Sequence, residues 1–299
     1  MIEQQLPTYI GPLEPFEFTI SNQVQGQYLE ALEDYHLRYV LGRQGAPPVI
    51  HPGILLNHSN ATKSPSFNGP NRHWIHLREQ THFAGSAHLN DGLIVRWRIE
   101  EHEPWFGRVL TRVSCVVTRC DGLLILERTM CGIRTSARRP IPAEGGRAVP
   151  DPANPAPMSR GHSRTSLDPT DWEIPGKQKR PTAERIGLFS GRASQNLHTN
   201  DQIAKDAGLP APVASATQGM GYLCEFMIDN LGEEWLASGS WVLTFRKPIF
   251  PGDEVRAFGR LRHVEPTDCG AQCTVDIKLV NQRGVTVTHG TATGHRKLG

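Results

Sequence analysis

The sequence lacks the marks of membrane-spanning, secreted and nucleic-acid-binding proteins. None of its apolar runs approaches the roughly 18 residues that a membrane-spanning helix needs. The first residues, MIEQQLPTYIGPLEP, contain no basic start followed by an apolar core, so a secretory signal is not expected. The 32 Lys and Arg residues almost balance the 30 Asp and Glu residues, and a net charge of +2 does not favour nucleic acid or an anionic membrane as a partner. These absences predict a cytoplasmic protein.

Cysteine is scarce and irregularly spaced. Three of the six cysteines fall in segments predicted as strands, and the cysteine spacings match no zinc motif. Without a secretory signal we expect no disulfide framework, and the thiols are predicted to be reduced and mostly buried. We expect neither a metal site nor a cofactor. The six residues are Cys115, Cys120, Cys131, Cys224, Cys269 and Cys273.

The chain is long enough for two medium domains, and it repeats itself weakly. Its 299 residues, 38% hydrophobic and 21% charged, are ordinary for a globular protein with a sizeable core. Asp91–Arg98 (DGLIVRWR) corresponds to Asp253–Arg260 (DEVRAFGR), and Gly122–Thr129 (GLLILERT) corresponds to Gly284–Thr291 (GVTVTHGT), both at an offset of 162 residues. A constant offset across two separate segments indicates two copies of one unit.

Each half ends in a block of four predicted strands. Runs rich in Val, Ile, Leu and Thr alternate with turn signals such as Asp121-Gly122 and Arg283-Gly284, which is typical of antiparallel hairpins. The predicted strands are 74–83, 92–102, 107–119 and 123–134 in the N-terminal half, and 238–247, 253–264, 270–281 and 285–294 in the C-terminal half.

Helical sequence precedes the strands in each half. Gln23–Asp34 places its apolar residues on one face, and Asn200–Gly208 begins with a capping residue and ends with a glycine. Gln218–Leu231 carries apolar residues at helical spacing on most of its surface, which predicts a buried helix. The pattern therefore favours a sheet wrapped around one apolar helix, repeated twice.

Residues 136–182 are predicted to link the two halves. Arg138–Pro181 contains nine prolines and no hydrophobic period, which is typical of an extended linker or a long surface excursion. Its basic run, Lys177-Gln178-Lys179-Arg180, fits either a solvated charge cluster or a contact to a phosphate-bearing ligand.

The segment Gly191–Leu223 carries the most specific pattern, GRASQNLHTNDQIAKDAGLPAPVASATQGMGYL. Without a gap, it resembles the hydratase signature of the MaoC-like hotdog family, (S)GDxNPxHxD…PIxHGM. His198 falls on the family's catalytic histidine. Ala216 falls on the glycine whose backbone amide polarises the thioester carbonyl. The resemblance implies an α+β double hotdog fold, with residues 1–135 as an N-terminal hotdog unit and 183–299 as a C-terminal unit.

Several chemical positions of that signature are changed in this chain. Ala193 stands where the family has its catalytic Asp, and alanine cannot transfer a proton. The substitutions at Gln195, Asn196 and Ser215, which replace the family's Asn, Pro and His, leave side chains that form hydrogen bonds but do not titrate. These three, together with Tyr222 in the helix body, are predicted to bind substrate.

The N-terminal half contains a second, incomplete copy of the pattern. Pro48–Gly53 aligns with Pro212–Thr217, which puts His51 at the position of Ser215. His58 follows, but no counterpart of the acidic motif precedes it. Both histidines fit either the lining of an acyl tunnel or a structural role, and we include them among the predicted substrate-binding residues.

The resemblance leaves three functions open. The first is a hydratase or dehydratase of an acyl thioester, with His198 as acid or base and the Ala216 amide as oxyanion donor. The sequence leaves open whether another carboxylate, such as Glu225 or Asp201, reaches the place of the missing Asp at Ala193. The second is an isomerase or cyclase of a specialised, non-thioester metabolite. The third is a non-catalytic acyl-binding subunit. A homodimer of double hotdogs is one assembly that the sequence allows.

Overall fold

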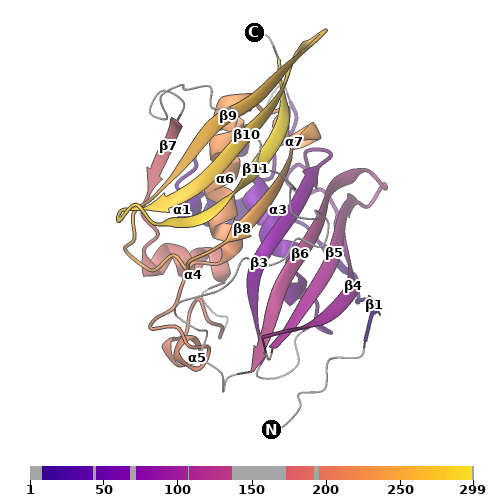
Figure 1. Cartoon of the computed structure of the whole chain (residues 1–299). Coiled ribbons are helices and arrows are strands. Elements are labelled where there is room, and N and C mark those ends of the chain that lie inside the picture. The colour runs from indigo at the N-terminus through magenta and orange to yellow at the C-terminus, as the bar shows by residue number, and fades with distance from the viewer. Residues whose placement is uncertain are drawn as a thin grey trace.

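One antiparallel sheet runs through both halves of the chain (Figure 1). The computed structural model describes residues 9–42, 45–67, 72–106, 108–136, 173–191 and 195–297. The strands are β1 (Gly11–Pro12), β2 (Phe16–Phe18), β3 (Arg72–Phe83), β4 (Leu93–Trp105), β5 (Arg108–Arg119), β6 (Leu124–Ser136), β7 (Glu173–Lys179), β8 (Ser240–Phe245), β9 (Val255–Thr267), β10 (Gly270–Asn281) and β11 (Thr286–Lys297). They follow the order β1-β4-β5-β6-β3-β8-β11-β10-β9-β7, and β2 pairs with β4.

The two halves of this sheet are copies of each other. Both ends of β4 lie 162 residues before the corresponding ends of β9, and the same holds for β5 and β10. The turns that lead into β4 and β9 also match. Asp91 accepts a hydrogen bond from the His88 amide, and Asp253 accepts one from the Phe250 amide, each at 2.8 Å. The eight strands predicted from the sequence are present, and the repeat inferred from its offset is confirmed.

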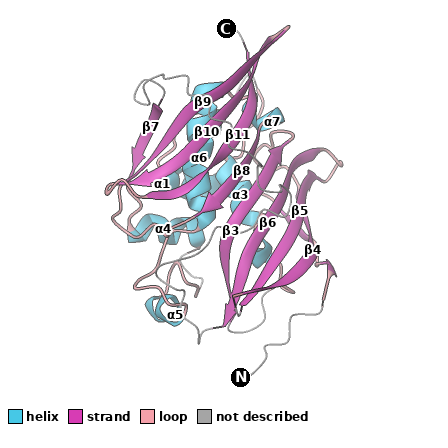
Figure 2. Cartoon of the chain, in the orientation of Figure 1, coloured by secondary structure: helices cyan, strands magenta, loops and turns pink. Residues whose placement is uncertain are grey.

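Each half-sheet covers a central helix on the same face (Figure 2). In the C-terminal half this helix is α6 (Ala216–Leu231), which is buried along almost its whole length as predicted. It begins two residues before the predicted start because the Ser215 side chain caps it. In the N-terminal half the central helix is α3 (Pro52–His58), which contacts α6 and was not predicted from the sequence. Seven residues show too little of a 3.6-residue period to be recognised.

Shorter helices complete this layer. α1 (Asn22–Leu32) and α5 (Asp201–Asp206) confirm two predicted helices. Gly221 lets α1 approach α6, since a Cβ atom there would lie 2.6 Å from Leu32 Cδ2. In the described part of the chain, no helix is long and apolar enough to cross a membrane. The other helices are α2 (Leu37–Val40), the 3-10 helix η1 (Ala61–Lys63), α4 (Ala183–Ser190) and α7 (Trp235–Ser238).

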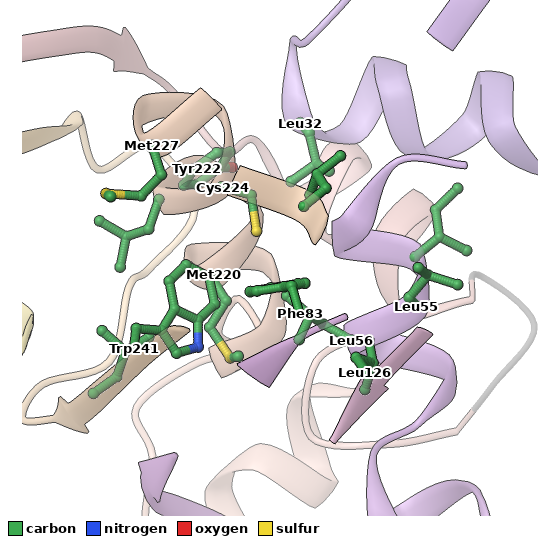
Figure 3. Packing of buried hydrophobic residues seen from close by; sticks show 14 of the residues in the cluster. Leu32, Leu55, Leu56, Phe83, Leu126, Met220, Tyr222, Cys224, Met227 and Trp241 are labelled. Carbon is green, nitrogen blue, oxygen red and sulfur yellow. The ribbon is translucent and has the colours of Figure 1, made fainter. Parts of the chain in front are cut away.

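Aromatic rings fill the junction between the two half-sheets. The ring centroid of Phe83, at the end of β3, lies 4.6 Å from that of Trp235 and 5.4 Å from that of Trp241. All three side chains are buried. Figure 3 shows Phe83 and Trp241 beside Met220 of α6. The two halves therefore share one hydrophobic core.

A buried ion pair supports the end of α3. The Arg128 guanidinium donates to Glu79 over 2.5 Å and 3.0 Å, and both side chains are fully buried. Its third nitrogen, Nη1, donates at 2.6 Å to the Leu56 carbonyl and to Ser59 Oγ. Carbonyls in the last turn of a helix lack partners within the helix, so Arg128 satisfies one of them. Burial alone would raise the pKa of Glu79, but the Arg128 charge and the hydrogen bond from His76 outweigh it and lower the pKa to about 2.

The end of the predicted linker takes part in the sheet. Residues 137–172 lie outside the described part of the chain, but 173–179 form β7, which pairs with β9. Both lysines of the basic run are paired with carboxylates of α6. Lys179 is 4% exposed and its Nζ lies 2.6 Å from Glu225, while Lys177 pairs with Glu225 and Asp229 at 2.9 Å. Sequence alone missed this because the acidic partners lie some fifty residues later, in α6.

All six cysteines are free thiols, and four of them are buried, as predicted. Burial raises the pKa of Cys115 to about 12 and raises that of Cys224 well above its usual range. These two thiols therefore remain protonated near neutral pH and contribute to the core as small apolar groups.

Replacing Arg128 by Met should destabilise the fold strongly. The variant leaves the Glu79 carboxylate buried without its cation, and we expect the free energy of unfolding in urea to fall by roughly 3–5 kcal/mol. Arg262→Met is a matched control, because Arg262 pairs with Asp276 at the surface and is 62% exposed. It should cause a much smaller change. Similar losses in the two variants would contradict a special contribution from the buried pair.

Candidate active site

A turn before α5 holds His198 in place. The Asn196 side-chain oxygen accepts a hydrogen bond from the His198 amide at 2.8 Å. Asn200 caps α5 by accepting from the Ile203 amide at 3.0 Å, and it donates to the Gln195 side chain at 2.6 Å. The amide side chains of Gln195 and Asn196, predicted to bind substrate, thus form part of the turn itself. Ala193 lies outside the described residues.

The His198 ring is fixed by one strong hydrogen bond. Its Nδ1 lies 2.7 Å from the Val213 carbonyl oxygen, which can only accept, so Nδ1 carries the proton. No described residue bonds the other ring nitrogen, Nε2, whose lone pair is therefore free. Desolvation lowers the pKa of His198 to about 4, assisted by the positive charge of Lys63 and opposed by the bond to Val213. At neutral pH the side chain is an uncharged imidazole.

The N-terminus of α6 follows three residues after Val213. Ser215 caps it, its Oγ accepting a hydrogen bond from the Gln218 amide at 3.1 Å. Ala216 is the first helical residue, and its amide has no recorded acceptor in the described part of the chain. The first amides of a helix lack partners within it and lie at the positive end of the helix dipole. An anionic oxygen here would be stabilised by the Ala216 amide.

A chain of buried hydrogen bonds connects this helix start to the N-terminal half. Thr217 Oγ lies 2.9 Å from Ser215 Oγ and donates to the Asn57 side-chain oxygen at 3.2 Å. The Asn57 amide group donates to Tyr28 Oη at 2.6 Å and to the Phe189 carbonyl at 3.0 Å. The network links α1, α3, α4 and α6. Neither Thr217 nor Asn57 was predicted as a site residue, because 160 residues separate them in the sequence.

His51 caps α3 in the same way that Ser215 caps α6, in agreement with their alignment. Its Nδ1 accepts a hydrogen bond from the Gly53 amide at 2.9 Å, and its Nε2 lies 3.1 Å from Asp34 Oδ2. The residue is completely buried. Burial would raise the pKa of Asp34, but the hydrogen bonds from His51 and from the His36 amide help to lower it to about 2. Both ring nitrogens of His51 thus form hydrogen bonds within the protein, which agrees with a structural role and not with the lining of an acyl tunnel.

His58 shares one electrostatic neighbour, Lys63, with His198. Its ring stacks on Phe18 with centroids 5.1 Å apart, and its Nδ1 lies 3.1 Å from the Ile54 carbonyl. Burial lowers the pKa of His58 to about 4, and the Lys63 charge adds to this effect. Lys63 thus opposes protonation of one histidine from each half. Lys63 was not among the site residues predicted from the sequence.

The remaining predicted residues lie elsewhere. Tyr222 is buried, and its hydroxyl accepts from Gln218 Nε2, which also contacts the Ala31 carbonyl of α1. Glu225 is paired with lysines of β7, and Asp201 is exposed in the first turn of α5. Over the described ranges, no carboxylate contacts the His198 ring, and no three His, Cys, Asp or Glu residues gather as metal ligands would.

Solved structures match the chain over almost its whole length, although no protein-family model and no curated protein sequence matches it. A MaoC-like dehydratase superposes with a TM-score of 0.71 at 14% identity, covering 97% of this chain and 99% of its own. A Mycobacterium tuberculosis protein described as a double hotdog superposes with a TM-score of 0.64 at 13% identity, covering 95% of this chain and 96% of its own.

A third match is the full-length peroxisomal multifunctional enzyme type 2 of Drosophila melanogaster, with a TM-score of 0.67 at 13% identity. The match covers 95% of this chain and 48% of that enzyme, so the chain spans about half of the enzyme's length. Together with the sheet order and the two central helices, these similarities show that the chain has a double hotdog fold, as the resemblance predicted.

The lowered pKa values of two histidines should make stability depend on pH. An unfolded histidine binds a proton near pH 6.5, whereas the folded-state pKa of both His58 and His198 is about 4. Between these values the unfolded state binds more protons, so the free energy of unfolding should fall as the pH is lowered from about 6.5 to about 4. His198→Gln should reduce this slope in urea titrations at a series of pH values. An imidazole NMR midpoint near 6.5 for His198 would contradict the assignment.

Proposed function

We propose that the chain is a lyase that adds water to, or removes it from, an acyl thioester or a related carbonyl substrate. The observation that carries the proposal is the joint placement of His198 and Ala216. Val213 fixes the imidazole by its Nδ1. Three residues later a buried helix begins at Ala216, whose amide has no acceptor among the described residues. A basic nitrogen and an oxyanion donor are the two groups that proton abstraction next to a carbonyl requires.

His198 acts alone in this reaction. In the dehydration of a β-hydroxyacyl substrate, Nε2 takes the Cα proton and the carbonyl oxygen becomes an enolate, which accepts a hydrogen bond from the Ala216 amide. The electron pair then forms the Cα–Cβ double bond as the C–O bond at Cβ breaks. The imidazolium returns its proton to the departing hydroxide, which leaves as water. Hydration follows the same steps in reverse.

Because the pKa of His198 is low, other groups of the site must help in removing the proton from the substrate. An imidazole with a pKa of about 4 is a weak base, so the Ala216 amide must stabilise the enolate for the proton to be removed. His58 and Ser215 are the other predicted residues that we retain near the substrate. His58 shares the electrostatic influence of Lys63 with His198, and Ser215 fixes the start of α6.

A second candidate is an isomerase or cyclase of a non-thioester metabolite. It is favoured by the lack of a carboxylate in contact with His198 among the described residues. Proton transfer between two carbons, or a ring closure next to a carbonyl, needs one base and one oxyanion donor but no second acid to activate water.

Removing the imidazole should abolish most of the activity. In assays of crotonyl-coenzyme A hydration, we expect His198→Ala and His198→Gln to lower kcat by roughly 10²- to 10⁴-fold. His82→Gln, which changes an exposed histidine of β3, is the matched control and should retain full activity. If the wild-type chain is active and His198→Ala retains that activity, His198 is not the acid or base.

Hydrogen exchange should distinguish the lyase from a non-thioester enzyme. A butyryl-coenzyme A substrate has no hydroxyl to eliminate, yet the proposed base should exchange its Cα protons with deuterated water. We expect this exchange in the wild-type chain, detected by mass spectrometry, and its loss in His198→Gln. If a correctly folded wild-type chain shows neither exchange nor hydration, the result favours the non-thioester candidate or the non-catalytic subunit.

A further inference from the structure

A cavity lies at the opposite end of α6 from His198. It has a volume of about 330 Å³, and its walls come from β7, β9, β10, β11 and the last turns of α6. Ligand sites in proteins begin at about 300 Å³, so the cavity has room for a small molecule. With a rise of 1.5 Å per helical residue, Phe226 to Leu231 lie roughly 15–22 Å beyond Ala216. The cavity is thus separate from the candidate active site.

The walls of the cavity are mainly apolar. The α6 side contributes Phe226 and Leu231, and the sheet side contributes Cys273 and Val275 of β10. Ile174, at the β7 edge, is 42% exposed and lies at the cavity wall. Apolar surface of this kind stabilises a ligand chiefly by removing its hydrocarbon part from water.

One charged group borders the cavity. Arg296 follows Ala292 and Gly294 along the helix-facing side of β11, and its side chain is exposed. Within the described residues, no hydrogen bond or ion pair is recorded for its guanidinium. The nearby lysines of β7 differ, since Glu225 and Asp229 neutralise them. The other polar residue of the wall, Asn230, already donates its amide to the Phe226 carbonyl at 2.8 Å.

We propose that this cavity binds a small carboxylic acid with an apolar tail. The tail occupies the space between α6 and β10, and the carboxylate pairs with Arg296. An unpaired guanidinium at the rim of an apolar cavity is complementary to that combination of groups, because it binds carboxylates in a bidentate manner. The site stands apart from the proposed lyase reaction and does not depend on it.

Octanoate and octanol are suitable probes because they share one tail and differ in charge. By isothermal titration calorimetry with the full chain, we expect octanoate to bind with one site per chain and octanol to bind more weakly. Arg296→Gln should weaken octanoate binding by roughly tenfold or more and change octanol binding little. Arg262→Gln removes an exposed, already paired arginine from β9 and should leave both affinities unchanged.

Filling the cavity provides an independent test. Ala271→Phe, at the half-buried wall position on β10, should abolish binding of both probes. Cys273→Met is a smaller change that should weaken both, and the melting temperature of each variant shows whether it is folded. Lack of octanoate binding by the wild-type chain would overturn the proposal, as would equal binding by Arg296→Gln or by folded Ala271→Phe. Loss of octanoate binding in His198→Gln would also overturn it, by placing the probe in the candidate active site.

Discussion

The antiparallel pairing of β3 with β8 is the contact on which the rest of the structure depends. Over Arg78–His82 and Ser240–Thr244 it joins two half-sheets edge to edge, and each half thereby covers an edge that would otherwise expose unpaired amides and carbonyls. It also sets the distance between α3 and α6. Because these helices meet, Asn57 can reach Thr217, and one histidine from each half comes under the influence of Lys63.

The environment of His198 keeps its ring neutral without a carboxylate partner among the described residues. In the family signature, an acidic residue shares the work of the histidine, whereas this chain has Ala193 at that position. Burial and the Lys63 charge both favour the neutral ring, so His198 needs no carboxylate to keep one nitrogen free. The proposed role of His198 does depend on the orientation of its ring. That depends on a backbone carbonyl, which is unaffected by substitution of the Val213 side chain.

Patterns local in sequence predicted the fold well, and contacts between distant residues limited the prediction of the site. The strands, α6 and the offset of 162 residues follow from periodicity and repetition, which need no knowledge of packing. α3 was missed because its seven residues include proline and glycine, and β7 was missed because prolines surround it. The turn residues and the Ser215 cap lie within the motif. Thr217, Asn57 and the partners of the β7 lysines become neighbours only when the two halves fold together.

The different capping residues of α3 and α6 affect which substitutions such a molecule can accept. Two identical subunits related by a twofold axis carry every substitution twice, so a histidine buried against an aspartate in one copy is imposed on the other. Here the two copies are covalently joined and differ in sequence. His51 anchors α3 to Asp34, while Ser215 leaves the start of α6 small and polar. One chain can thus devote one helix start to rigidity and leave the other free to acquire new chemistry.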